Sequence, residues 1–196
     1  MRCKLNFFLK VMILVAVSCL FVSFSYAKDV ERLSDEQLDS IVESRPYEYN
    51  SDIISTQTIF PGSNAIQYKV HCANIGWQGW KNNGEIAGTI GESRRMEAIQ
   101  MITNGVDIGI RYQPHVRNIG WLGWFFNGEV AGTIGQERQM EAIKIMLTNN
   151  PDDYSVYYKV HMAKIGWGPW QKDGEVAGST GQGRQIEAIQ ILLIEL

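Results

Sequence analysis

Hydrophobic and polar residues alternate along residues 66–73 with the two-residue period of a β-strand. Tyr68, Val70 and Cys72 fall on one face, and the polar residues between them fall on the other. Because successive side chains of a strand point to opposite sides of a sheet, we expect the first face to pack on a core. The same alternation returns twice along the chain, in the sets Tyr112, Pro114, Val116 and Tyr158, Val160, Met162.

The alternating segment opens a unit that occurs three times, over residues 66–103, 110–147 and 156–193. All three histidines and all six tryptophans of the protein occupy equivalent positions in these units. Internal repeats of this length indicate one supersecondary unit that buries its apolar face only against its neighbours. The sequence therefore predicts a single three-repeat domain over residues 66–196.

Each unit is expected to form four short strands around a two-residue turn. The turn is Asn83-Gly84 in the first unit, Asn127-Gly128 in the second and Asp173-Gly174 in the third, and such pairs favour tight hairpins. A last strand is expected over the segment "RMEAIQMI", which begins at Arg95, with Glu97, Ile99 and Met101 on its inward side. Twelve strands in three units predict an all-β fold with pseudo-threefold symmetry, a β-trefoil or alternatively a β-prism.

A hairpin at Asn83-Gly84 would place Trp80, Asn82, Glu85 and Ala87 on one side. The opposite side would hold Trp77 with apolar residues and glycines, so we expect Trp77 and its equivalents Trp121 and Trp167 to lie in the core. An exposed indole beside polar groups suits the apolar face of a sugar ring. The candidate ligand-binding residues are Trp80, Asn82, Glu85, Trp124, Glu129, Trp170 and Glu175. The alternative is that both sets of tryptophans pack between neighbouring units.

Histidine, glutamate and arginine also recur in triplicate. Three symmetry-related histidines could converge on zinc, but a structural histidine bonded to a carboxylate is the commoner case. We expect each repeated glutamate to pair with the arginine three residues before it or with the repeated histidine. Catalysis usually needs one asymmetric constellation of groups, so we expect no enzyme, no metal and no other cofactor. These residues are His71, His115 and His161, Glu97, Glu141 and Glu187, and Arg94, Arg138 and Arg184.

The first 27 residues have the order of a secretory signal peptide. Basic residues precede an apolar run from Val11 to Phe24, and Ser25-Tyr26-Ala27 supplies a small-residue cleavage site. Removing residues 1–27 takes away Arg2, Lys4 and Lys10 and no acidic residue, so the net charge changes from −3 to −6. An acidic surface disfavours nucleic acid. We expect a secreted protein without a membrane span after cleavage, in which Cys72 is the only cysteine left.

A lead-in covers residues 28–65 and contains one predicted helix. Ser34 is a helix N-cap with Gln37 three residues later, a capping-box pattern. Leu38, Ile41 and Val42 share one face at helical spacing. We expect a short helix over 34–44, followed by a loop through Pro46, Pro61 and Gly62; the alternative is a disordered spacer with a nascent helix.

The three units resemble the ChW repeat, the clostridial hydrophobic repeat with a conserved tryptophan. The resemblance rests on "HCANIGWQGW…NGEIAGTIGESRRMEAI" and its two copies, and the family's Gly-Trp corresponds to Gly76-Trp77, Gly120-Trp121 and Gly166-Trp167. It implies an exported or surface protein of a Gram-positive bacterium with a non-catalytic binding role, towards polysaccharide or other proteins. The third unit departs from the others at Gly168-Pro169, so a site there would be altered.

These expectations combine into a secreted, lectin-like binding module. We expect it to recognise carbohydrate or cell-wall polysaccharide through one shallow tryptophan-centred site per repeat, and it could return to the cell wall. Weak sites in triplicate gain by avidity on a polymer. A protein-interaction or surface-scaffold module is the alternative, with the helix at 34–44 as a docking segment.

Overall fold

The computed structural model describes residues 32–44, 65–104, 108–150 and 154–195. The signal peptide predicted for residues 1–27 and the loop predicted through Pro46, Pro61 and Gly62 lie outside these ranges. The helix and all strands discussed below belong to one unit of the chain, Ser34–Leu196. Within the described residues, no helix has both the length and the apolar character needed to cross a membrane.

The predicted helix is present as α2 (Asp35–Glu43). Its capping box is complete, because the Ser34 hydroxyl accepts a hydrogen bond from Gln37 N at 3.2 Å and the Gln37 side chain accepts one from Ser34 N at 2.8 Å. Leu38 is fully buried, while Ile41 and Val42 on the same face are half-buried. A helix of nine residues is marginal alone, so its burial against the rest of the chain contributes to its stability.

The three repeats have five strands each rather than the predicted four, because two short strands pair with the first long strand. Repeat 1 holds β1 (Ile66–Cys72), β2 (Gly76–Trp77), β3 (Lys81–Asn82), β4 (Ile86–Gly88) and β5 (Met96–Thr103). Repeat 2 holds β6 (Gly109–Val116), β7 (Gly120–Trp121), β8 (Phe125–Phe126), β9 (Val130–Gly132) and β10 (Met140–Thr148). Repeat 3 holds β11 (Tyr154–Met162), β12 (Gly166–Trp167), β13 (Gln171–Lys172), β14 (Ala177–Gly178) and β15 (Ile186–Glu195).

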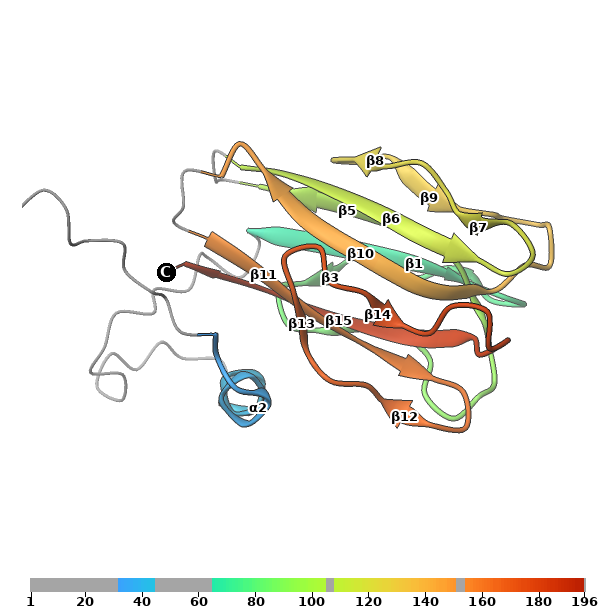
Figure 1. The fold of residues 1–196 in the computed structure, drawn as a ribbon, viewed down its shortest axis with the longest axis horizontal. Coiled ribbons are helices and arrows are strands. Elements are labelled where there is room, and N and C mark those ends of the chain that lie inside the picture. The colour runs from blue at the N-terminus through green and yellow to red at the C-terminus, as the bar shows by residue number, and fades with distance from the viewer. Residues whose placement is uncertain (1–31, 45–64, 105–107, 151–153, 196) are drawn as a thin grey trace, which may run out of the picture. The chain divides into compact units, whose positions relative to one another are not determined.

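The strands form three antiparallel sheets, each completed by a strand of another repeat (Figure 1). In the first sheet β1 pairs with β2, β3 and β5, and β5 also pairs with β9 of repeat 2. In the second, β10 pairs with β14 of repeat 3. In the third, β15 pairs with β4 of repeat 1. Repeat 2 therefore gives a strand to the sheet of repeat 1, repeat 3 gives one to the sheet of repeat 2, and repeat 1 gives one to the sheet of repeat 3. This cyclic exchange ties the three sheets together.

This exchange overturns the predicted hairpin. The turn itself forms, since Glu85 N donates to Asn82 O at 2.9 Å. Beyond the turn the chain leaves its own repeat: Gly84 N donates to Ile191 O at 2.7 Å, and the Asn83 side chain bonds the backbone N and O of Leu193. β3 therefore pairs with β1, whereas β4 pairs with β15, and the predicted hairpin does not continue beyond Asn82 and Glu85.

Glycine makes the close approach of the exchanged strands possible. Gly132 has a φ of +129°, and a Cβ atom placed there would lie 2.2 Å from the carbonyl oxygen of Glu97. Gly88 and Gly178 occupy the same place in the other two sheets, and a Cβ atom placed at either would lie 2.3 Å from the corresponding carbonyl oxygen. Only a residue without a side chain fits such a contact.

The core lies where the predicted inward faces of the long strands meet. Burial alternates strictly along β1, and Tyr68, Val70 and Cys72 are fully buried, as predicted. The corresponding faces of β6 and β11 join the same hydrophobic cluster, together with residues of β5, β10 and β15. One core thus serves all three repeats.

Three buried tyrosines connect neighbouring repeats through their hydroxyl groups. The Tyr68 hydroxyl accepts a hydrogen bond from Ile191 N at 3.1 Å and donates one to Glu85 O. Tyr112 and Tyr158 accept from Met101 N and Ile145 N, at 3.2 and 3.1 Å. Burial raises the pKa of Tyr112 to about 12. A buried hydroxyl satisfied on both sides fixes the spacing of the strands that it joins.

Candidate functional site

Repeat 1 presents two tryptophans on either side of a lysine. Trp77 ends β2 and is 36% exposed, and Trp80 precedes β3 and is 40% exposed. Lys69, from the middle of β1, places its Nζ 5.0 Å from the Trp77 ring centroid and 4.7 Å from that of Trp80. Both distances are within the range of a cation–π contact. We call this set of two tryptophans and a cation the tryptophan–cation site.

The position of Trp77 contradicts the prediction that it belongs to the core. β2 pairs with the outer edge of β1 and sets Trp77 opposite His71, on the face that carries polar residues. The two rings meet edge to face, with centroids 5.6 Å apart. Trp121 and Trp167 repeat this arrangement with His115 and His161 and are likewise not buried.

The two sides predicted for the turn are also reversed beyond Glu85. Ala87, expected beside Trp80 on the exposed side, is fully buried, while Ile86, expected on the core side, is 40% exposed. The reason is that Ala87 pairs with Ile189 in the sheet of repeat 3. The direction of the Ala87 side chain is therefore determined by the sheet of repeat 3 and not by a hairpin with β3.

In repeat 2 the cations come from different positions. Gln113 replaces the lysine, and its amide donates to Leu122 O at 2.7 Å. Lys144 of β10 lies over Trp121 at 4.6 Å, and the Arg111 guanidinium lies over Trp124 at 4.8 Å. Trp124 is half-exposed. Repeat 2 therefore also has a tryptophan–cation site, but its cations are Arg111 of β6 and Lys144 of β10 instead of a lysine at position 113.

Repeat 3 repeats the geometry of repeat 1, but α2 occupies the site. Lys159 lies 5.4 Å from the Trp167 ring centroid and 4.6 Å from that of Trp170. Asp39 Oδ1 of α2 accepts hydrogen bonds from Trp170 Nε1 at 2.9 Å and from Lys159 Nζ at 2.5 Å. Trp170, a predicted exposed ligand-binding residue, is only 2% exposed. The prediction of exposure is wrong here because the protein's own helix lies against this indole.

The Asp39 carboxylate is held in its charged form by these donors. Burial acts to raise the pKa of Asp39, but the hydrogen bonds from Lys159 and Trp170 and the charge of Lys159 outweigh it. The pKa of Asp39 is consequently below its usual value. An ammonium and an indole N–H that converge on one oxygen form a small receptor for a carboxylate.

The predicted ligand-binding glutamates have contacts within their own turns. In each repeat one carboxylate oxygen accepts a hydrogen bond from a backbone N–H three residues earlier, at 2.6, 2.6 and 2.8 Å. The Asn82 side chain accepts one from Gln67 Nε2 at 2.9 Å. The glutamates remain exposed, and these bonds stabilise the loop next to the tryptophans; they are Glu85, Glu129 and Glu175.

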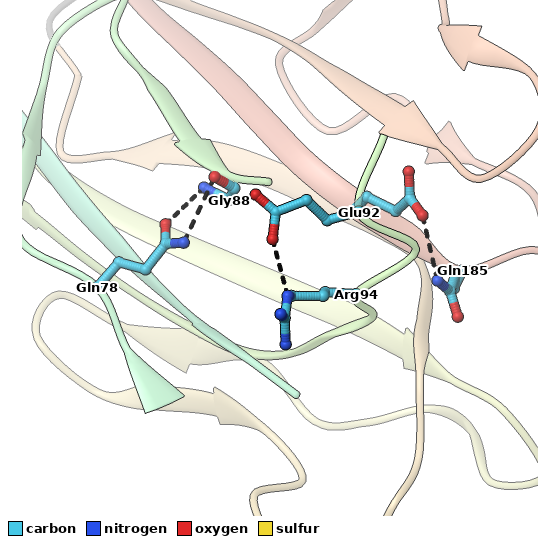
Figure 2. A network of polar contacts seen from close by, with 6 residues as sticks. Gln78, Gly88, Glu92, Arg94 and Gln185 are labelled. Carbon is cyan, nitrogen blue, oxygen red and sulfur yellow. Dashed lines mark hydrogen bonds and ion pairs between the residues drawn. The ribbon is translucent and has the colours of Figure 1, made fainter. Parts of the chain in front are cut away.

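The repeated histidines and glutamates pair within each repeat. Nδ1 of His71, His115 and His161 lies 3.2, 3.4 and 3.3 Å from a carboxylate oxygen of Glu97, Glu141 and Glu187. The predicted structural pairing with histidine is therefore confirmed. Of the predicted arginines, Arg94 instead bonds Glu92 at 2.8 Å (Figure 2).

A β-bulge explains how the glutamate reaches the histidine. Cys72 pairs with Met96 and His71 with Ala98, which leaves Glu97 as the extra residue. Glu97 therefore departs from the predicted face of Ile99 and Met101 and contacts His71 on the outer side.

Within the described ranges, no group of three or more His, Cys, Asp or Glu residues could hold a metal ion. A shallow pocket of about 250 Å³ beside the second pair is lined by His115, Arg117, Asn118, Glu141, Gly181 and Gly183.

Sequence reasoning missed the cations and one glutamine of the site. Gln78, between the two tryptophans of repeat 1, accepts a hydrogen bond from Gly88 N at 2.9 Å and donates to Gly88 O at 3.4 Å (Figure 2). It ties the tryptophan loop to the exchanged strand β4. The signal for the cations was in the repeats, since Lys69 and Lys159 occupy equivalent positions eight residues before Trp77 and Trp167. Nothing in the sequence pattern assigned Asp39 to repeat 3.

The fold and the sites define a three-repeat β protein in which each repeat carries its own tryptophan–cation site. The chain belongs to the Clostridial hydrophobic W (ChW) family, whose model matches residues 71–105, 115–149 and 161–195, more than half of the chain. The matched segments begin at the three histidines and so correspond to the predicted repeats. Neither the curated proteins nor the solved structures searched include a match.

Proposed function

We propose that this protein is a secreted, non-catalytic binding module that recognises protein segments at its tryptophan–cation sites. The single observation that supports the proposal is the packing of α2 against repeat 3. There an indole N–H and an ammonium bind a carboxylate at 2.9 and 2.5 Å, and Leu38 beside it is fully buried. A charged anchor next to an apolar one is typical of recognition of an amphipathic helix in a groove.

Export is part of the proposal and rests on the basic, apolar and small-residue order of residues 1–27. Family membership supports it, because the ChW resemblance implies exported or surface proteins of Gram-positive bacteria. Cleavage before Lys28 is tested by N-terminal sequencing of protein recovered from a culture medium. Retention of the first 27 residues would contradict the export route.

Protein recognition is tested by displacing α2 from repeat 3. The paired change Leu38→Ala and Asp39→Asn removes both anchors, so Trp170 should become accessible and its fluorescence should shift to longer wavelength and become quenchable by acrylamide. A synthetic peptide of residues 32–44, added in excess, should reverse both changes. A peptide of the same composition in scrambled order is the matched control. No reversal by the native-sequence peptide would refute recognition of protein segments at this site.

Carbohydrate recognition, the leading expectation from the sequence, is the second candidate function. The observation that favours it is that Trp77 and Trp80 are both more than one-third exposed in repeat 1. Neighbouring indoles offer flat apolar surfaces for stacking against sugar rings. A glycan array with the wild-type chain, the single variants Trp80→Ala and Trp124→Ala, and the double variant that combines them tests the idea. Glycan binding that a folded double variant retains would exclude these indoles.

We also propose that the three sheets form a β-prism, the alternative to the β-trefoil in the sequence analysis. The support is that each repeat contributes to two sheets and that the exchange of β4, β9 and β14 closes on itself. Three sheets whose repeats exchange strands in this way suit the three faces of a prism. An experimentally determined structure whose sheets instead close as a six-stranded barrel with a hairpin cap would contradict it.

A further inference from the structure

We infer that the tryptophan–cation site of repeat 1 is a second acceptor for a short acidic amphipathic helix, open to a partner in trans. The inference rests on the proposed function and adds to it the site and the chemistry of the partner. The partner is a helix like α2, with adjacent leucine and aspartate side chains and no basic residue. A chain has one α2, and that helix lies on repeat 3.

Repeats 1 and 3 present the same donors on the same backbone frame. Lys69 stands 4.7 Å from the Trp80 ring and Lys159 stands 4.6 Å from the Trp170 ring. The strand registers that set these positions are equivalent, because His71 pairs with Trp77 as His161 pairs with Trp167. The receptor that binds the Asp39 carboxylate in repeat 3 is therefore duplicated in repeat 1.

The two sites differ in exposure. Trp80 is 40% exposed, and its equivalent Trp170 is 2% exposed under α2. Occupation of repeat 1 by a similar helix would cover a comparable area of indole, and burial of apolar area drives such docking. Gln78, absent from the equivalent place in repeat 3, ties the tryptophan loop to Gly88 and holds the open site in position.

Repeat 2 does not reproduce this receptor. Gln113 stands where repeats 1 and 3 have lysine, and its amide donor is used by Leu122 O. The cation over Trp124 is Arg111, two residues earlier on the strand, where its Nη2 also contacts the Met146 sulfur at 3.5 Å. The inference is thus specific to repeat 1.

The occupant is identified by the charge and apolar face of α2. Residues 34–44 carry four carboxylates, at Asp35, Glu36, Asp39 and Glu43, and no lysine or arginine. The buried leucine precedes the bonded aspartate directly, so one helical turn presents both anchors. A neutral sugar ring would satisfy the indole but would leave the lysine without an anion. The geometry therefore favours an acidic helix over a neutral glycan at this site.

The test counts how many peptides the full chain binds. A capped peptide of residues 34–44 is titrated calorimetrically into the wild-type chain, where the tethered α2 holds repeat 3 at an effective concentration near the millimolar range. We expect one peptide per chain, bound at repeat 1. Trp80→Ala should abolish this binding, and Ile134→Ala, at an apolar side chain that is 43% exposed and outside the tryptophan–cation sites, should leave it unchanged. In the chain with Leu38→Ala and Asp39→Asn, repeat 3 is vacated and the number should rise to two.

Two further arms separate packing from hydrogen bonding. Trp80→Phe keeps an aromatic ring and lacks the N–H donor, so it should weaken binding about tenfold or more without unfolding the chain. A peptide in which the residue equivalent to Asp39 is asparagine keeps an acceptor oxygen and loses the negative charge, so it should bind the wild-type chain about tenfold more weakly. Equal affinity of the native and asparagine peptides would overturn the carboxylate receptor.

The outcomes also distinguish this inference from the proposed function. If the vacated chain takes one peptide at repeat 3 while repeat 1 takes none, the proposed function stands and the second acceptor is refuted. If neither repeat binds the peptide, both are refuted. If a neutral oligosaccharide protects Trp80 from quenching and the peptide does not, repeat 1 is a sugar site and the helix acceptor is refuted.

Discussion

Gly132→Ala should destabilise the protein far more than alanine at a nearby glycine, because Gly132 carries the strand exchange between repeats 2 and 1. A Cβ atom at Gly132 would lie 2.2 Å from Glu97 O and 2.6 Å from Ala98 Cα. Both obstacles are backbone atoms of a long central strand, so relief requires movement of β9 away from β5.

The magnitude follows from two contributions. Side chains in left-handed backbone conformations cost about 1–2 kcal/mol, and overpacking in a core costs about 1–3 kcal/mol. Gly132, with a φ of +129°, incurs both and should lose about 2–5 kcal/mol. Gly135, three residues later, has a φ of +72° and nothing within 4 Å of a built Cβ, so its alanine variant should lose about 1–2 kcal/mol.

Urea unfolding of the wild-type chain and the two variants measures the difference, provided that the dependence on denaturant is unchanged. We expect Gly132→Ala to have the lower midpoint by a clear margin. Equal losses for the two variants would refute the reasoning, because the close approach of β9 to β5 would then contribute nothing. A loss larger at Gly135 would do the same.

Three further results are expected. The free energy of unfolding should fall as the pH rises from about 10 towards about 12, because burial raises the pKa of Tyr112 to about 12 and the fold accommodates the neutral phenol. Tyr112→Phe should reduce this fall. An alkaline profile that the substitution leaves unchanged would contradict the assignment. The buried Cys72 thiol, whose pKa burial raises to about 11, should resist alkylation by iodoacetamide at pH 8 until the chain is unfolded, and fast labelling of the folded protein would be inconsistent with the structure. Asn83→Ala should cost about 1–3 kcal/mol for each of the two Leu193 backbone groups left unpaired, and a loss below 0.5 kcal/mol, about the size of a neutral surface change, would exclude the bonds across the repeats.

The local features of the chain were predictable from local patterns. Alternation along residues 66–72 placed Tyr68 and Val70 in the core, and the Ser34–Gln37 capping box located α2. Three copies of one unit predicted one shared core. These predictions hold because strand period and capping depend on residues close together in sequence.

The candidate site was predictable only in part. The repeats singled out the tryptophans, but the choice of which indole is exposed was wrong for Trp77 and for Trp170. Trp77 follows β2 to the outer edge of β1, and Trp170 is covered by a helix 131 residues away in the sequence. Exposure depends on what packs against a side chain, and the distant partner leaves no periodic signal in the strand.

The sequence by itself determined the repeats, the inward faces of the long strands and the helix. Only the tertiary structure decided where β4 pairs and what covers Trp170. Asn83 and Gly84 favour a turn in any context, but a turn does not choose the strand that follows it. The pairing of the strand after the turn is determined by the backbone groups of Ile191 and Leu193, more than 100 residues away. These groups are buried, so they need hydrogen-bond partners that water cannot replace.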